Sequence, residues 1–273
     1  MSQNPLEQYF RQPKIYINLP SLGMYSPPDT YIGSVENIPV YSMTGMDEII
    51  IKTPDALMSG ESNIRIIESC CPSIKNARNL SSLDSNVIFA AIRIATYGNN
   101  LEVTHTCEKC SNVNDYNLDL MRIIDFYSNK KYDNRIVVGE LVIKTQPLTF
   151  QQSMEFNIKH FEVQQQLFQT EKIENSEEKQ KVIDKLWNGF AQTQYKLYTL
   201  SIESIETPNQ TVTERGYIEE WISNCDTSII DKLKDHLNKL KIDWDIPKFP
   251  IECNNCGAKS DLKIDLNYSN FFL

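Results

Sequence analysis

The sequence predicts an α+β fold with a small ribbon-like β unit held together by two cysteine pairs, an N-terminal extended arm, an N-terminal helical region and a large helical insertion. Three observations lead to this fold class. Two C-x2-C pairs stand far apart, long amphipathic helical patterns lie between them, and prolines punctuate the first 45 residues. With 273 residues, of which 41% are hydrophobic, the chain can bury a core in one large or two small domains.

Residues 1–45 are predicted to form an extended, proline-rich arm. Six prolines between Pro5 and Pro39 rule out a long helix. We expect such a segment to gain its order by lying on a neighbouring protein. The alternation of Ile15, Ile17 and Leu19 leaves a second interpretation open, in which this stretch is a strand of the protein's own sheet.

Residues 46–100 are predicted to be a helical region. Short helical stretches are expected at 47–51, 54–58 and 61–71, where Gly and Pro act as stops. A longer buried helix follows, because apolar residues recur at helical spacing between Val87 and Ala95. Ser81 with Asp84 resembles a capping box for this helix, which Gly98 ends.

Residues 101–146 are predicted to contain the first half of the ribbon and a hairpin. The stretch 101–106 has strand character and runs straight into a cysteine pair. The stretches 135–138 and 141–144 are joined by Gly139 and Glu140. A two-residue loop with glycine first favours a type II′ hairpin.

Residues 147–245 are predicted to be the helical insertion. Two long helices, the first ending near Thr170 and opened by a capping box of Thr149 and Gln152, indicate an antiparallel helical hairpin. Shorter helices are expected over 213–224 and after Asp226. The apolar face of the first long helix is interpreted as core; it comprises Phe150, Met154, Ile158, Phe161 and Phe168. Residues 246–273 complete the ribbon.

The two cysteine pairs share a longer pattern. Residues 107–120 and 253–266 both read C-x2-C-x4-D-x2-[LI]-D-L, with Asp115 matching Asp261 and Asp119 matching Asp265. Two thiolates three positions apart on a tight turn can reach one ion, and four of them close a tetrahedral shell around zinc. The sequence therefore predicts a structural Zn²⁺ in a zinc ribbon, with four ligands: Cys107, Cys110, Cys253 and Cys256.

Two other interpretations of these cysteines stay open, namely a redox dithiol or disulfide, and unrelated surface residues. The pairs are much farther apart than the roughly 15–20 residues of usual ribbons, but chance pairs would lack the matching tails. His105 is expected to be an ordinary strand residue and not a ligand. A catalytic zinc is disfavoured because such sites usually have three protein ligands and an open position. Cys70, Cys71 and Cys225 are interpreted as small buried residues.

Composition and motifs exclude several functions. Acidic residues outnumber basic ones by 36 to 27, which opposes attraction to a polyanion, so nucleic acid is not expected as a partner. No metalloprotease, nucleophile-elbow, dinucleotide or phosphate-loop motif is present in the sequence, and an enzyme is not predicted. No apolar run approaches the roughly 18 residues that span a bilayer. The N-terminus lacks the apolar region of a signal peptide, so the chain is expected to be cytosolic where it is made.

Several blocks in the N-terminal half resemble a known family. They occur in this order: residues 19–25 (LPSLGMY), 38–49 (IPVYSMTGMDEI), 53–60 (TPDALMSG), 91–98 (AIRIATYG) and the first cysteine pair. This order is similar to that of the baseplate hub subunit and hub assembly family of T-even-like contractile-tailed bacteriophages. The resemblance covers about residues 13–120 and does not reach the helical insertion.

The resemblance implies a noncatalytic phage tail protein. Its location would be the tail baseplate of the virion, reached from the host cytoplasm during assembly, and its partners would be other tail and baseplate proteins. A hub assembly factor that leaves before the virion is complete is the first alternative. A zinc-ribbon nucleic-acid-binding module is the second, and the acidic composition disfavours it. The sequence does not set the oligomeric state.

Overall fold

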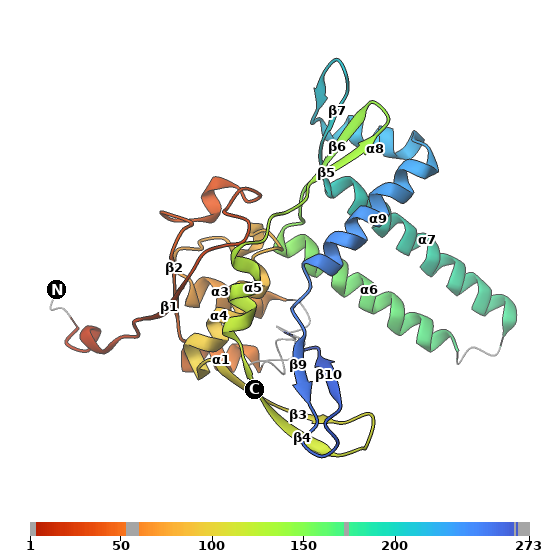
Figure 1. Cartoon of the computed structure of the whole chain (residues 1–273). Coiled ribbons are helices and arrows are strands. Elements are labelled where there is room, and N and C mark those ends of the chain that lie inside the picture. Colours follow the sequence, from red (N-terminus) through yellow and green to blue (C-terminus); the bar gives the residue numbers. More distant parts are fainter. Residues whose placement is uncertain (1–3, 53–59, 172–174, 265, 267–273) are drawn as a thin grey trace. The chain divides into compact units, whose positions relative to one another are not determined.

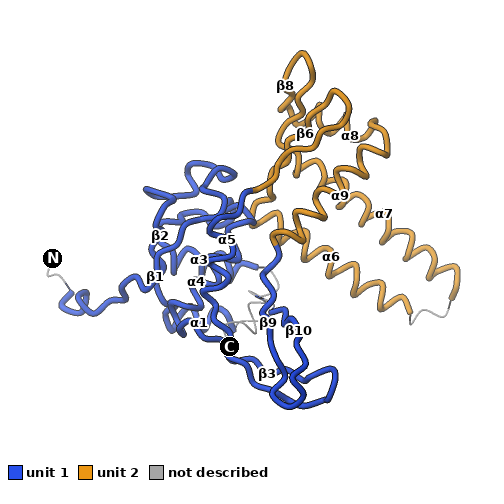
Figure 2. The backbone as a smooth tube through the Cα atoms, in the orientation of Figure 1, with its two compact units in different colours: residues 1–131, 245–273 blue, residues 132–244 orange. Residues whose placement is uncertain are grey.

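The computed structural model describes residues 4–52, 60–171, 175–264 and 266, and it confirms a mixed α+β fold with small sheets. The chain divides into two compact units (Figure 2). Unit 1 contains residues 1–131 and 245–273, and unit 2 contains residues 132–244. The expected helical stretch at 54–58 and the matched residue Asp265 lie outside the described residues.

The centre of unit 1 is helix α4, Ser85–Tyr97, whose side chains from Val87 to Ile92 are almost fully buried. Strands β1 (Pro13–Ile17) and β2 (Ile38–Tyr41) pair antiparallel and lie against α4 (Figure 1). Helices α1 (Gly45–Ile51) and α3 (Glu61–Cys70) pack beside them. The described residues of this part also include short 3₁₀ turns at Glu7–Tyr9, Pro28–Thr30 and Ala77–Asn79.

The expectation of a docking arm is wrong for residues 11–44. Arg11 donates hydrogen bonds to the carbonyl oxygens of Ser42 (2.5 Å) and Ser69 (2.7 Å). Ile17 and Leu19 are buried in unit 1. The segment is therefore ordered by the protein's own helices, because its alternating apolar residues supply one side of the core. The other interpretation, a strand of the protein's own sheet, is the correct one.

The predicted capping box at Ser81 and Asp84 is also wrong. The helix begins at Ser85, and the Asp84 side chain makes no cap hydrogen bond. Its carboxylate accepts hydrogen bonds from the backbone N–H (2.8 Å) and the hydroxyl (2.6 Å) of Ser21 instead. A capping box does open α1, where Thr44 and Asp47 bond reciprocally. Asp84 thus joins the N-terminal segment to the central helix.

Two β-hairpins of unit 1 carry the two cysteine pairs. Strands β3 (Asn100–Thr106) and β4 (Val113–Asp119) make the first, and β9 (Phe249–Glu252) and β10 (Lys259–Leu262) the second. Helix α5, Met121–Ser128, follows β4 and packs on α4 through Ile123 and Tyr127. No pattern in the sequence predicted α5.

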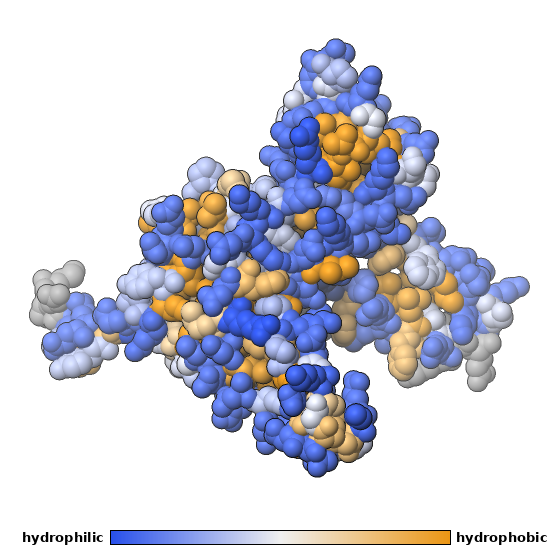
Figure 3. All heavy atoms as spheres, viewed as in Figure 1, coloured by the Kyte–Doolittle hydropathy of each residue, from blue (hydrophilic) through white to orange (hydrophobic). Residues whose placement is uncertain are grey.

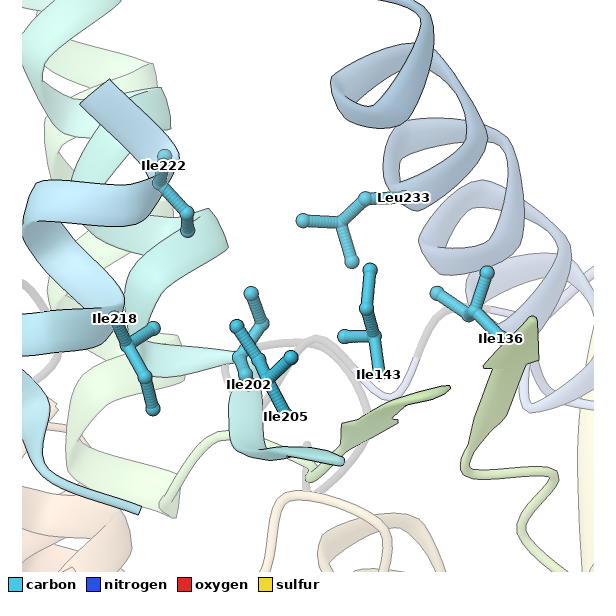
Figure 4. Close-up of a cluster of buried hydrophobic side chains, with 7 residues drawn as sticks. All are labelled: Ile136, Ile143, Ile202, Ile205, Ile218, Ile222 and Leu233. Atoms are coloured by element: carbon cyan, nitrogen blue, oxygen red, sulfur yellow. The ribbon is translucent and has the colours of Figure 1, made fainter. Parts of the chain in front are cut away.

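Unit 2 contains a four-stranded antiparallel sheet in the order β5–β6–β7–β8. Its strands are β5 (Arg135–Val138), β6 (Leu141–Thr145), β7 (Ile202–Glu206) and β8 (Thr211–Val212). Helices α8 (Arg215–Asn224) and α9 (Thr227–Asp243) bury an aliphatic cluster against this sheet (Figure 4). The cluster comprises Ile136, Ile143, Ile202, Ile205, Ile218, Ile222 and Leu233. The β5–β6 hairpin therefore packs with the helices of unit 2.

Two long helices complete unit 2, namely α6 (Phe150–Thr170) and α7 (Ser176–Leu200), and they run antiparallel (Figure 1). The predicted capping box of Thr149 and Gln152 is confirmed. The core interpretation of the α6 apolar face is correct for Phe150, which is buried, but wrong for Phe161 and Phe168, which are exposed. Among the described residues, only Phe150 and Thr170 of α6 are buried. Part of the apolar surface of α6 is therefore not buried within unit 2.

Candidate metal centre

The four predicted cysteines lie on two turns of the same construction. Each pair sits between the strands of a hairpin, Cys107 and Cys110 between β3 and β4, and Cys253 and Cys256 between β9 and β10. In the first turn the N–H of Ser111 donates to the carbonyl oxygen of Cys107 (2.8 Å), and in the second the N–H of Gly257 donates to that of Cys253 (2.9 Å). The duplicated sequence thus forms the same turn twice. We call each of these turns a knuckle.

A left-handed residue follows each cysteine pair. Ser111 has φ of 57° and Gly257 has φ of 65°. This conformation turns the chain back so that the N–H of Cys107 bonds the carbonyl oxygen of Asn112, and the N–H of Cys253 bonds that of Ala258, both at 2.9 Å. Glycine adopts it without steric cost, whereas serine does so at a cost. The turn of the first knuckle therefore carries backbone strain at Ser111.

The two knuckles bring all four Sγ atoms together, within 4.8 Å of one another. The Sγ atoms of Cys107 and Cys256 are 3.8 Å apart, and those of Cys110 and Cys253 are 3.6 Å apart. Zinc–thiolate bonds of about 2.3 Å in a tetrahedron require sulfur–sulfur separations of about 3.8 Å. A disulfide would need about 2.05 Å, and all seven cysteines are free. The donor set and spacing fit a tetrahedral metal.

Backbone N–H groups favour thiolates at this centre. The N–H groups of Cys256 and Asn255 point at the Cys253 sulfur and lower the pKa of that thiol to about 6. The N–H of Asn112 lowers the pKa of Cys110. At Cys256 the N–H of Ala258 also lowers the pKa, but the neighbouring thiols and desolvation together outweigh it and raise the pKa to about 11. Such donors stabilise metal-bound thiolates.

Asn114 of β4 ties the first hairpin to the second knuckle. Its side chain is buried, its Oδ1 accepts a hydrogen bond from the backbone N–H of Asn254 (3.0 Å), and its Nδ2 lies 3.6 Å from the Cys253 sulfur. The hydroxyl of Tyr116 donates to the carbonyl oxygen of Glu252 (3.1 Å). Neither residue was predicted from the sequence. The only signal was their place in the short stretch after Cys110, which carries no chemistry by itself.

The other cysteines and His105 do not join the centre. Among the described residues, the cluster of potential metal ligands contains the four knuckle cysteines alone. His105 lies on β3, as the sequence predicts. Cys70 and Cys71 are buried in α3 and just after it. Burial raises the pKa of Cys70 to about 12 and the pKa of Cys71 well above its usual value, so neither favours the thiolate that binds metal.

The chemistry of this donor set is structural. Four thiolates would fill all four positions of a tetrahedral ion and leave no place for a reacting water or substrate. Within the part of the chain that the structure describes, no helix is long and apolar enough to cross a membrane. Fold and centre together define an α+β protein with paired cysteine knuckles on separate hairpins.

The chain belongs to the family described as T4 bacteriophage base plate protein, whose model matches residues 43–273. The resemblance to T4-like baseplate proteins is thereby confirmed, and it extends through unit 2, which the sequence blocks did not reach. No curated protein and no solved structure matches the chain. Membership identifies a structural protein of the phage baseplate, implies a place in the virion tail, and connects the protein with a class that is generally non-enzymatic.

Proposed function

We propose that this protein is a noncatalytic subunit of the hub region of a phage tail baseplate, held in shape by one structural Zn²⁺ and acting through contacts with other tail proteins. The observation that carries the proposal is the family match over residues 43–273. The hub assignment is supported by the ordered blocks between Leu19 and Cys110. The protein reaches the virion from the host cytoplasm during assembly.

The zinc assignment rests on the geometry of the two knuckles. Cys107, Cys110, Cys253 and Cys256 hold the ion, and the N–H groups around them offset the negative charge of four thiolates. The ion joins two hairpins whose cysteines are up to 149 positions apart in sequence. Its role in this proposal is to fix those hairpins, and no chemical step passes through it.

A hub assembly factor that leaves before completion of the virion is the second candidate. It shares the family match and the absence of catalytic motifs in the sequence. A nucleic-acid-binding ribbon is less favoured because residues 251–266 contain two lysines against three acidic residues. A salt-sensitive shift of DNA or RNA by the purified protein would support that last function.

Disruption of the gene in its phage tests the proposal. We expect heads and packaged DNA to form normally, while tails stop at an incomplete baseplate that lacks the hub. Normal tails in the mutant would contradict a baseplate role altogether. A baseplate that retains its hub but fails at a later stage would contradict the hub assignment alone.

The protein content of purified particles then separates the two candidates. A subunit gives stoichiometric peptides in intact virions, for example those that contain Trp187. An assembly factor gives none, although its loss produces the same tail defect. Expression of Cys110→Ser/Cys256→Ser in the disrupted phage asks whether the metal is needed: a failure to restore tails is expected.

A further inference from the structure

The α6–α7 hairpin presents an aromatic face, which we define as Phe161, Phe168 and Trp187. Their side chains are 53%, 67% and 55% exposed. Single exposed apolar residues are common, but a cluster on one element marks an interaction surface. Hydrophobic residues are visible along this hairpin in Figure 3. The face belongs entirely to unit 2.

Ring contacts show which side of α6 is already occupied. His160 of α6 packs on Phe190 of α7, with ring centroids 6.0 Å apart. A helix turns by about 100° per residue, so Val163 and Leu167 share the side of His160 that meets α7. Phe161 and Phe168, seven residues apart, point away from it. Helix α6 therefore carries two apolar stripes, and α7 covers only one of them.

Trp187 extends this face onto α7. Its ring meets that of Phe190 edge to face, with centroids 5.9 Å apart. Because the helices run antiparallel, the turn of about 60° between these residues directs Trp187 to the side on which Phe161 and Phe168 lie. The aromatic face thus spans both helices.

The polar residues around the aromatic face are mainly uncharged amides. Helix α6 contains six glutamines, of which Gln164, Gln165 and Gln169 adjoin the two phenylalanines. Each amide carries both a donor and an acceptor, so it can bond to an identical amide. Residues 149–200 contain seven acidic and six basic residues, whereas the whole chain carries a net charge of −9. A second copy of this face would meet no excess of like charge.

We propose that the aromatic face binds the same face of a second copy, so that two α6–α7 hairpins pack as a four-helix bundle with twofold symmetry. A buried aromatic side chain contributes roughly 150–250 Å². Six such side chains, each about half exposed, together with the aliphatic parts of the amides, would bury roughly 1,000 Å², the lower end for specific interfaces. The expected dimer is accordingly weak and dissociates at micromolar concentration.

Sedimentation of the full-length, metal-loaded protein tests this proposal. We expect concentration-dependent dimers for the natural chain and at least tenfold weaker association for Phe161→Glu and for Trp187→Glu. Ile242→Glu is the matched control, because Ile242 lies on α9 of the same unit and is 75% exposed. It should associate like the natural chain. A mixture of Phe161→Glu and Phe161→Lys should recover association, since opposite charges then meet.

A natural chain that stays monomeric at 100 µM would overturn the proposal, including the case in which the face binds only a different protein. Unchanged dimers in both Glu variants would overturn it as well. Circular dichroism separates lost association from lost folding, because the surface variants should keep the natural spectrum. Metal content should be the same in all variants, so this result is independent of the proposed baseplate and zinc roles.

Discussion

Asp84 is a buried carboxylate whose partners come from one distant segment. Ser21 donates both its N–H and its hydroxyl to it. Burial outweighs these hydrogen bonds and raises the pKa of Asp84 from 3.8 to about 7. Tyr31 lies near, and burial together with the charge of Asp84 raises the pKa of that phenol to about 12. Near neutral pH the protein therefore holds a carboxylate that is difficult to ionise.

The sign of the resulting pH dependence follows from the raised pKa. The folded state binds the Asp84 proton more tightly than the unfolded state, so this group stabilises the fold below about pH 4 and loses that contribution as pH rises to about 7. The shift corresponds to a change on the order of 4 kcal/mol. We expect Asp84→Asn to remove this slope in urea unfolding measured from pH 4.5 to 7.5.

Asp226→Asn is the control for that measurement. The N–H of Ser228 lowers the pKa of Asp226, so its titration lies below the tested range and the natural slope should remain. If Asp84→Asn and the natural chain have parallel stability curves, the raised pKa of Asp84 is wrong.

The four cysteines of the centre should bind one zinc per chain. Cys110→Ser/Cys256→Ser removes one thiolate from each knuckle, and we expect it to lose the metal in elemental analysis of protein made with zinc present. Cys225→Ala should retain a full equivalent, because Cys225 lies in unit 2, outside the cluster. Metal-free natural protein, or full retention in the double variant, would contradict the assignment.

Asn114 should act as a positioning residue for the metal. Loss of a group that orients a ligand typically lowers metal affinity 10–100-fold. We expect Asn114→Ala to weaken zinc binding by about that factor in competition with a chelator, while one zinc still binds at saturation. Asn117→Ala is the matched control, since Asn117 is exposed on the same strand. Equal affinities in the two variants would assign Asn114 a purely structural role.

At the scale of elements, glycine has opposite roles in unit 2. Gly139 has φ of 59° in the β5–β6 turn, whereas Gly189 lies within α7. A Cβ added at either position would meet nothing within 4 Å. We expect Gly139→Ala to lower the unfolding free energy by about 1 kcal/mol through left-handed strain. Gly189→Ala should raise it by about 0.5–1 kcal/mol through helix propensity.

Urea unfolding of these two variants checks the hairpin assignment. They carry the same chemical change in the same unit, so differences in composition cannot explain opposite signs. A stabilising Gly139→Ala would show that the turn does not keep its left-handed residue in solution.

Elements with their own local signals were predictable from the sequence. The two-residue hairpin at Gly139, the capping box at Thr149 and the helix after Asp226 depend on residues within a few positions of one another. The packing of residues 11–44 was not predictable, because prolines exclude a helix without showing which surface the chain will cover. The exposure of Phe161 was not predictable for a similar reason. Periodicity shows that a helix is amphipathic, but it does not show what covers the apolar face.

The candidate site was predictable only in part for a similar reason. The C-x2-C spacing and the matching tails predicted that the pair beginning at Cys107 lies beside the pair beginning at Cys253, because both pairs belong to the same repeated local structure. Asn114 became recognisable only when the hairpins were seen together, since its partner Asn254 lies 140 positions away. A single asparagine beside a cysteine pair carries no pattern that sequence analysis can use.

At the scale of the whole molecule, the two units have separate sources of stability. The four knuckle cysteines bring the hairpins of unit 1 together, whereas the aliphatic cluster of unit 2 contains none of the knuckle residues. We expect chelation to lower the melting temperature of unit 1 and to leave that of unit 2 nearly unchanged. Hydrogen exchange should then accelerate in β3, β4, β9 and β10, while β6 and β7 stay protected.

The double cysteine variant should reproduce the exchange pattern of the chelated protein. Equal loss of protection in both units after chelation would show that they unfold together, and the metal would then stabilise the whole molecule.

The separation of the two knuckles also imposes an order on synthesis. Cys110 leaves the ribosome long before Cys253, which follows it by 143 residues. At translation rates of roughly 5–20 residues per second, the first pair waits roughly 7–30 s for the second. During that interval it offers an ion only two thiolates, while unit 2 emerges between the halves of the site. The four-cysteine centre can therefore be completed only after both units have been translated. A chain truncated before Cys253 lacks the second cysteine pair and cannot complete the centre.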